Sequence, residues 1–315
     1  MSEATEISSS SPTPDRSSSL SAKDIAWTVA QPVLVLGSAL LVATMVASEW
    51  ADHKVYALIM IMLPVPLLLL AERIWAKRKD WLLKPHELYE DGFWLGFAAL
   101  LWGPLISDFY STPISEGFRA LRDRSPLDIT IAPETALGLL GGAILIKICS
   151  SFVYYWLHRV QHESVFFWRM HATHHHITKM GCLRGDRTHP LEYLSLAISG
   201  PIFLALFGAS DEVIAVIAAF GMWNGKLNHS NLPLKSLPVY DWVFATAQQH
   251  HCHHAHKREQ ADSNYGCQII LWDRIFGTYC GDTEVGQIGA GKAQPLSIKE
   301  QLLLAFYPTK RLTSL

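Results

Sequence analysis

The sequence predicts an all-α protein that crosses a membrane several times. Of its 315 residues, 50% are hydrophobic and only 17% are charged, whereas a soluble domain carries nearer a quarter charged residues. The mean hydropathy is +0.16, and several apolar runs approach the ~20 residues that a helix needs to cross a bilayer. The net charge of −2 argues against the concentrated basic face of a nucleic-acid-binding protein, so no nucleic-acid partner is expected.

The first 135 residues divide into a polar tail and a membrane region. Residues 1–22 are rich in Ser, Thr and Pro and are expected to form a disordered N-terminal tail, because they cannot bury enough apolar surface to offset their ordering entropy. Residues 23–135 are expected to form an N-terminal transmembrane region. It contains three apolar runs, at 25–48, 55–71 and 92–106.

A fourth apolar run covers residues 136–157 and leads into a histidine-rich segment. Two shorter apolar pieces follow at 193–207 and 213–223, separated by a Gly-Ala-Ser-Asp turn. Each piece is short for a span, so a re-entrant hairpin and two tilted crossings are both open. The expected architecture is about four transmembrane helices, a short apolar hairpin and a cytoplasmic helical cap that carries the histidines.

Basic residues give the expected orientation, because Lys and Arg near span ends mark the cytoplasmic side. A basic stretch at 73–84 follows the second run, and placing it inside puts residues 108–134 outside. The fourth run then returns the chain to the cytoplasm, so every histidine cluster faces that compartment, at the inner membrane if the protein is bacterial. Arg119, Arg122 and Arg124 oppose this orientation, because it places them outside.

The histidines are concentrated in one part of the chain: 13 of the 15 lie between residues 158 and 256. They form one HxxxH box, two HxxHH boxes and one isolated histidine. Residues at i, i+3 and i+4 share a helix face, and the two adjacent histidines of an HxxHH box can diverge toward different metal ions. Nine imidazoles are too many for one ion and suit two. Imidazole binds iron, zinc, copper and nickel alike, so spacing does not choose the metal. The candidate catalytic and metal-ligating residues are His158, His162, His171, His174, His175, His229, His250, His253 and His254.

The boxes resemble a known family. HRVQHE at 158–163, HATHH at 171–175, RTHPLE at 187–192, HHCHH at 250–254 and the stretch at 264–279 are together similar to the fatty acid hydroxylase/sterol desaturase superfamily. Its members are integral-membrane, histidine-rich di-iron oxygenases. The resemblance covers residues 136–280, expected to be the catalytic region, and leaves 281–315 as a C-terminal tail. Glu163 directly after the first box is similar to the alkylglycerol monooxygenase branch.

The resemblance implies that the eight box histidines and His229 hold two iron ions, which zinc can replace in a purified protein. A tenth ligand would be water, His189, His251 or His256. It also implies O2 as co-substrate, a lipid substrate that is hydroxylated or desaturated, and a separate electron-donor protein, cytochrome b5-like or a ferredoxin with its reductase. The Glu163 feature favours hydroxylation.

Several polar residues near the boxes have two readings each. Glu163, Asp186 and Glu192 either accept the free N–H groups of ligating imidazoles or belong to a solvated face with neighbouring arginines. Lys147 lies inside the fourth run, eleven residues before the first histidine of the boxes. An intramembrane charge is a candidate functional group, although the long stem could also snorkel toward the interface.

Two other functions remain open from the sequence. One is a sterol or isoprenoid desaturase of the same superfamily. The other, from a different class, is a histidine-rich membrane metal transporter, which would place ionisable residues along a path inside the spans. Nearly all histidines here lie beyond the span ends, which favours the oxygenase.

Overall fold

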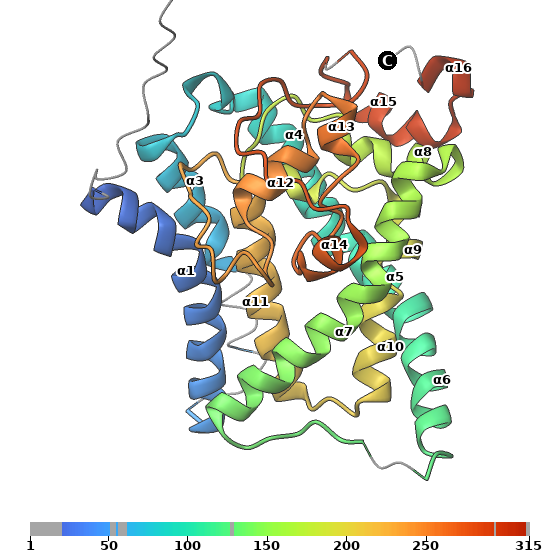
Figure 1. The fold of residues 1–315 in the computed structure, drawn as a ribbon. Helices are drawn as coiled ribbons and strands as arrows, with labels where there is room; N and C mark the ends of the chain where they lie inside the picture. The colour runs from blue at the N-terminus through green and yellow to red at the C-terminus, as the bar shows by residue number, and fades with distance from the viewer. Residues whose placement is uncertain (1–20, 51–54, 56–61, 127–128, 293, 313–315) are drawn as a thin grey trace, which may run out of the picture.

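The computed structural model describes residues 21–50, 55, 62–126, 129–292 and 294–312, and it is helical throughout (Figure 1). No strand occurs among these residues, which contain only two isolated β-bridges, Phe244–Ile269 and Ala255–Ile288. The α-helices in chain order are α1 (Ala22–Ala47), α3 (Pro64–Trp75), α4 (Pro85–Phe97), α5 (Gly103–Ile106), α6 (Thr112–Arg122), α7 (Ala136–Glu163), α8 (Val165–His175), α9 (Tyr193–Leu196), α10 (Ser199–Leu206), α11 (Asp211–His229), α12 (Ala247–His253), α13 (Arg258–Ala261), α14 (Leu271–Phe276), α15 (Ile298–Leu303) and α16 (Thr309–Leu312). Short 3-10 turns lie at Lys79–Trp81, Arg184–Asp186, Pro190–Glu192 and Leu304–Phe306, and π-helical turns at Ala98–Trp102 and Ser107–Ser111.

Three helices of the described chain are long and apolar enough to cross a membrane: α1, the continuous helix Pro85–Arg122 that joins α4 to α6, and α7. They contain the first, third and fourth apolar runs. The second run lies largely outside the described residues, and its described part is α3, which begins at Pro64. The protein is therefore an all-α, multi-pass integral membrane protein. Nearly all of the expected tail at 1–22 also lies outside the described residues.

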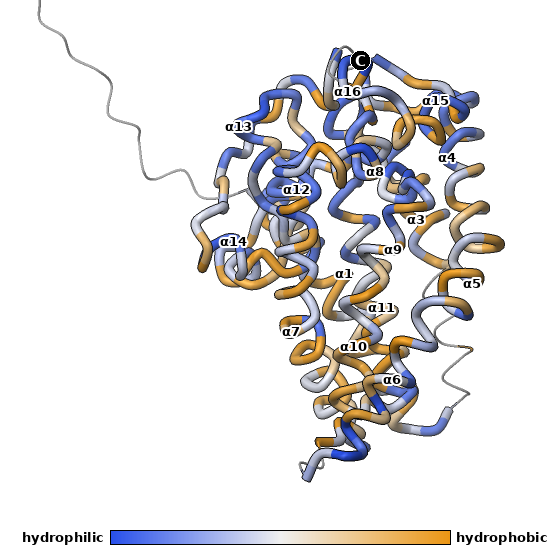
Figure 2. The backbone as a smooth tube through the Cα atoms, turned by 90° about the vertical axis from the view of Figure 1, so that its right-hand side faces the viewer, coloured by the Kyte–Doolittle hydropathy of each residue, from blue (hydrophilic) through white to orange (hydrophobic). Residues whose placement is uncertain are grey.

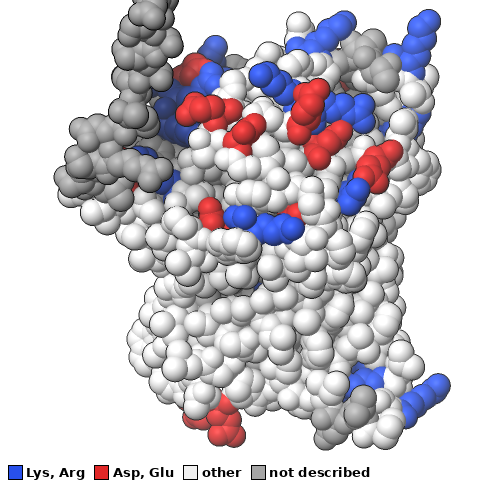
Figure 3. All heavy atoms as spheres, viewed as in Figure 1, with Lys and Arg blue, Asp and Glu red and all other residues white. Residues whose placement is uncertain are grey.

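The molecule has an apolar helical part and a polar cap. Figure 2 shows mainly hydrophobic residues in the lower part, around α7 and α10, with hydrophilic residues at its lower end, and hydrophilic residues around α12, α13 and α16. On the face drawn in Figure 3, charged side chains gather in the cap and at the lower end, with an uncharged band between them. This distribution is expected for a protein whose uncharged band lies in a bilayer, because charged groups are costly in hydrocarbon.

The core of the membrane part is formed by α1, α7 and α11. Val35, Ala39 and Ala43 of α1 and Ala219 of α11 belong to one buried apolar cluster. Small side chains at such positions let helix backbones approach closely. Helix-capping side chains fix where two of these helices begin: Thr135 accepts a hydrogen bond from the third residue of α7, and Ser210 accepts one from the third residue of α11.

The two apolar pieces at 193–207 and 213–223 form a hairpin that runs the full depth of this helical part. Its turn lies beside the segment that precedes α7, because Ile131 N–H donates to the Phe207 carbonyl (2.8 Å) and Ser210 N–H donates to the Ile131 carbonyl (3.1 Å). The turn therefore reaches the end of the molecule from which α7 starts. Of the two alternatives left open by the sequence, this arrangement favours two crossings over a re-entrant dip.

The segment after residue 280 packs against the cap. Leu296, Leu304 and Leu312 form a buried cluster with Ala172 of α8. The Thr173 hydroxyl donates to the Gln301 carbonyl at 2.9 Å. The stretch treated as a tail from sequence alone thus braces the helix that carries the second histidine box.

A buried ion cluster ties α4 to the loop between α8 and α9. Asp91 is fully buried and accepts from Arg187 at 2.6 Å and pairs with Arg184 at 3.3 Å. Arg184 also pairs with Glu87 at 3.1 Å. A buried ion pair is strongly destabilising when one partner is removed, because the other charge stays behind uncompensated.

We therefore expect Asp91→Asn to lower the free energy of unfolding by about 3 kcal/mol. The measurement is the loss of helical circular dichroism on heating the purified protein in detergent. Glu116→Gln is the matched control, because Glu116 is exposed. Equal melting temperatures for the two variants would contradict this account of the cluster.

Candidate metal centre

Four helices deliver the nine candidate histidines to one place in the cap. The first box occupies the last two turns of α7, and the extended backbone of Ser164 (φ −110°, ψ 120°) ends that helix so that α8 begins at once in a new direction. His229 ends α11. The third box lies on α12, whose start is fixed by Gln249 accepting from Thr246 N–H at 2.9 Å. The helical boxes expected from the spacing are therefore present.

The nine imidazoles form two buried groups. In each group the candidate ligand nitrogens all lie within 4.8 Å of one another. The adjacent histidines of each HxxHH box diverge, one to each group. The five-histidine group consists of His158, His162, His171, His175 and His253, and the four-histidine group consists of His174, His229, His250 and His254.

Backbone carbonyls orient two imidazoles of the five-histidine group. His158 Nδ1 donates to the Tyr265 carbonyl at 2.6 Å, and His253 Nδ1 donates to the Ser263 carbonyl at 2.7 Å. A carbonyl only accepts, so each Nδ1 carries the proton and each Nε2 keeps its lone pair. The His158 Nε2 lies 2.9 Å from the Nε2 of His171, so these lone pairs point into the group.

Carboxylates orient two more imidazoles of the same group. His171 Nδ1 donates to Glu192 Oε1 at 2.6 Å, with both side chains buried. His162 Nδ1 donates to Asp262 Oδ1 at 3.3 Å. Such outer partners fix the tautomer of an imidazole and raise its basicity as a ligand.

In the four-histidine group the Nε2 atoms face one another directly. His250 Nε2 lies 2.9 Å from His229 Nε2, His254 Nε2 lies 3.2 Å from His250 Nε2, and His174 Nε2 lies 3.4 Å from His229 Nε2. The Nδ1 of His229 donates to the Gly225 carbonyl, one turn earlier in α11, at 3.0 Å. Its Nε2 is therefore the nitrogen left for a ligand.

Gly185 packs directly on the His229 ring. A Cβ at this position would lie 2.7 Å from His229 Nδ1, so any larger residue would push the imidazole aside. Sequence reasoning did not identify Gly185, because a glycine in a polar loop gives no sign of what lies over it.

The histidines on α8 and α12 are neutral at physiological pH. Burial, assisted by the neighbouring imidazoles, lowers the pKa of His171, His175 and His253 well below the ordinary value. The same cause lowers the pKa of His254, and burial lowers the pKa of His174 to about 4. Neutral imidazole is the form that binds a metal.

The donor set fits metal ions. The Nε2 atoms of His162, His175 and His253 are buried and have no hydrogen-bond partner within the protein, although buried polar atoms are normally paired. Imidazole nitrogens bind an ion at about 2.0–2.1 Å, which keeps any two of them within about 4.2 Å of each other. The Nε2 pairs described above, 2.9–3.4 Å apart, lie inside this limit, and the 4.8 Å bound on each whole group lies just above it. Neither group contains a carboxylate or a cysteine among the described residues.

The three alternative histidines lie outside both groups. His189 uses both nitrogens elsewhere: Nε2 donates to the Leu302 carbonyl and Nδ1 accepts from Leu191 N–H. His251 Nε2 donates to the Ser230 carbonyl at 3.1 Å, and His256 is exposed. The structure thus brings none of them to the position of a tenth ligand.

The acidic residues singled out in the sequence have different roles. Glu192 contacts a candidate ligand, as described above. Asp186 instead forms an ion pair with Lys226, and Glu163 pairs with Arg159 at 2.8 Å. Asp262 contacts His162 and was not predicted from the sequence. It lies eight residues after the third box, a spacing that matches no recognisable motif.

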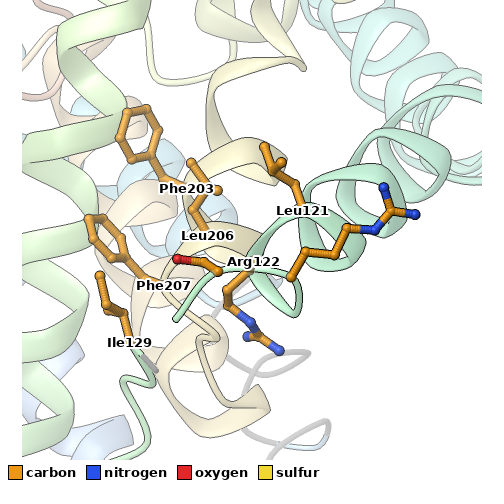
Figure 4. A pocket seen from close by; sticks show the side chains of 8 residues that line it. Leu121, Arg122, Ile129, Phe203, Leu206 and Phe207 are labelled. Carbon is orange, nitrogen blue, oxygen red and sulfur yellow. The ribbon is translucent and has the colours of Figure 1, made fainter. Parts of the chain in front are cut away.

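Three cavities lie at different distances from this site, and two of them adjoin it. One of about 350 Å³ is lined by His162, His175 and Trp168 and meets the five-histidine group from the cap. One of about 290 Å³ lies below the group, beside Tyr154 and Cys267. A third, of about 460 Å³, lies at the other end of the molecule between α6 and α10 (Figure 4); no histidine lines it.

Comparison with known proteins identifies the histidine-bearing region. The fatty acid hydroxylase family model matches residues 143–278. The ornithine lipid hydroxylase OlsE of Rhizobium tropici is 31% identical over 168 residues, which is 50% of each chain. The alkylglycerol monooxygenase of Homo sapiens is 31% identical over 157 residues, 50% of this chain and 34% of that protein. Methylsterol monooxygenase 2-1 of Arabidopsis thaliana is 29% identical over 143 residues, 42% of this chain and 53% of that protein.

The chain spans about half the length of the first of these relatives and about a third of the second. No solved structure matches it. The family resemblance expected from the histidine boxes is confirmed, and the match places residues 143–278, the histidine-bearing region, in the fatty acid hydroxylase superfamily.

Proposed function

We propose that this protein is a membrane-bound di-iron oxygenase that uses O2 and external electrons to hydroxylate a lipid. The observation that carries the proposal is the pair of adjacent all-imidazole groups in the cap of a multi-pass membrane protein. The relatives support it, because their names describe hydroxylation or mono-oxygenation of an ornithine lipid, an alkylglycerol and a methylsterol.

The nine histidines are the proposed ligands, with one ion for each group. Iron bound there would supply the O2 activation that amino-acid side chains lack. The same imidazoles also suit zinc, so a purified protein can carry zinc in these positions. In domain terms, residues 136–280 would be the catalytic region and residues 23–135 the membrane region that supports it.

The chain's own contribution would be orientation and exclusion of water. The Tyr265 and Ser263 carbonyls and the Glu192 and Asp262 carboxylates hold the Nδ1 protons of four ligands. Gln31 of α1 adds a further support, because it accepts from the first N–H of α12 at 3.0 Å and donates to Asn228 at 2.7 Å. These contacts position the ligands before any ion binds, which is what a preorganised site requires.

The cavities described above give a lipid two ways to approach the five-histidine group. The 290 Å³ cavity is lined in part by α7, a candidate membrane span, so a lipid tail would reach it from the bilayer. The 350 Å³ cavity is on the cap side, where a separate electron-donor protein, cytochrome b5-like or a ferredoxin with its reductase, would bind.

The cap is proposed to face the cytoplasm. The basic stretch at 73–84 lies on the cap side, since Arg78 N–H donates to the Asn231 side chain and the Arg78 guanidinium bonds the Gly286 carbonyl. Basic residues next to membrane spans are enriched on the cytoplasmic side. In a bacterium the membrane would be the inner membrane.

Substitution of Glu192 tests the proposed ligand set. Glu192→Gln keeps an acceptor for His171 but removes the carboxyl group that orients it, and loss of such a partner typically costs 10–100-fold in metal affinity. We expect iron or zinc affinity, measured by competition with a chelator, to fall by at least about tenfold. Glu163→Gln is the matched control, because Glu163 pairs with Arg159 rather than with a histidine. Equal affinities in the two variants would rule out this role for Glu192.

Lipid analysis tests the activity itself. Cells that express the wild-type protein are expected to contain a lipid heavier by one oxygen atom, which is missing from cells that express His253→Ala. A lipid lighter by two hydrogen atoms would instead identify a desaturase. His256→Ala is the control, because that exposed histidine lies in neither group. Identical lipid profiles in cells with and without the wild-type protein would contradict an oxygenase function.

A further inference from the structure

A cavity that is lined in part by polar side chains lies inside the membrane part of the molecule. It has a volume of about 290 Å³ and is enclosed by α7, the start of α10 and the loop 266–269. Most residues at this depth are hydrophobic (Figure 2), yet the side chains that line the cavity include Lys147, Ser151, Tyr154 and Gln268. A hydrocarbon tail alone would not require these polar groups.

The polar residues of α7 form one stripe that leads to the metal centre. Lys147, Ser151, Tyr154 and His158 are spaced by four, three and four residues, so they share a helix face. At 1.5 Å per residue, Lys147 lies about 16 Å along the helix from His158. The Tyr154 ring is 5.5 Å from the His158 ring. Along α7 the cavity therefore runs from Lys147 to Tyr154, whose ring lies against His158.

A second contact chain connects the same cavity to His158. The Tyr154 hydroxyl donates to Cys267 Sγ at 3.3 Å, and Cys267 Sγ lies 3.6 Å from His158 Nδ1. Tyr154 and Cys267 both line the cavity. A molecule that fills it would thus contact the groups that surround a proposed ligand.

Two polar groups at the cavity lack partners. The Lys147 ammonium forms no hydrogen bond or ion pair with any described residue, and the buried Gln268 Oε1 has no hydrogen-bond partner. Lys147 lies eleven residues from the start of α7 and eleven residues from His158, so each is about 16 Å away along the helix, farther than the four-carbon stem of the lysine reaches. The stem alone therefore does not carry the ammonium to the start of α7 or to His158. An unpaired cation inside a membrane span is costly unless it serves a ligand or a pathway.

We propose that this cavity binds a hydrogen-bond-accepting oxygen carried on the hydrocarbon part of the lipid substrate, and that Lys147 is the residue that selects for it. The inference rests on the proposed function for the position of the reacting carbon, which would lie at the His158 end. The acceptor oxygen, a carboxylate or a hydroxyl, would lie at the Lys147 end. A lipid without such an oxygen would leave the ammonium unpaired and would bind more weakly.

The test is equilibrium binding of radiolabelled palmitate, hexadecanol and hexadecane to the full-length purified protein in detergent. The wild-type protein is expected to bind palmitate or hexadecanol at least about tenfold more tightly than hexadecane, equivalent to about 1.4 kcal/mol. Lys147→Met should abolish this preference, whereas Lys147→Arg should keep the preference for palmitate. Lys292→Met is the matched control, because Lys292 is exposed in a loop near the C-terminus.

Preference for palmitate alone identifies an anionic group, and equal preference for palmitate and hexadecanol identifies a neutral acceptor. Equal binding of all three probes to the wild-type protein would overturn the proposal. So would an unchanged preference in Lys147→Met. Binding is measured without O2 or electrons, so a failure here leaves the lipid analysis of His253→Ala unaffected, and the two proposals fail separately.

Discussion

Nine imidazoles are buried in the cap with too few hydrogen-bond partners from the protein. A buried polar atom without a hydrogen bond costs about 1–3 kcal/mol, and six nitrogens of the two groups are in this state: one on each of His162, His174, His175, His250, His253 and His254. Protonation does not relieve the cost, because burial and the neighbouring imidazoles disfavour the charged form. Three of the six are Nε2 atoms, on His162, His175 and His253, and a bound ion would satisfy their lone pairs; the other three are Nδ1 atoms. The arrangement is therefore consistent with a metal centre, and without bound ions these Nε2 atoms would remain buried and unpaired.

The surrounding elements can be understood as supports for that arrangement. The loop at 264–280 places the Tyr265 carbonyl against His158, and Asp273 holds the loop by accepting from Tyr265 N–H at 2.8 Å and Gly266 N–H at 2.7 Å. The loop between α8 and α9 places Glu192 against His171 and is itself fixed by the ion cluster around Asp91. The membrane helices provide the rigid base, and α1 reaches the centre through Gln31. Stability and the geometry of the site are thus produced by the same contacts.

The features that depend on local periodicity could be predicted from the sequence. The apolar runs predicted the long helices, and the i, i+3, i+4 spacing predicted that adjacent histidines such as His174 and His175 diverge to different groups, as they do. Features that are set by contacts between distant segments could not be predicted in this way. The carbonyl of Tyr265 has no side-chain signature, Gly185 matters only because His229 packs on it, and Asp186 pairs with Lys226 instead of a histidine. The depth of the hairpin depends on hydrogen bonds to Ile131, which lies far away in the sequence.

The most direct test of the central claim is the metal content and ligand environment of the purified, iron-reconstituted protein, measured by elemental analysis with X-ray absorption at the iron edge. Convergence of the nine histidines predicts two ions per chain whose nearest protein ligands are nitrogen atoms of imidazoles. One ion or none per chain, or sulfur atoms in direct contact with the metal, would contradict it.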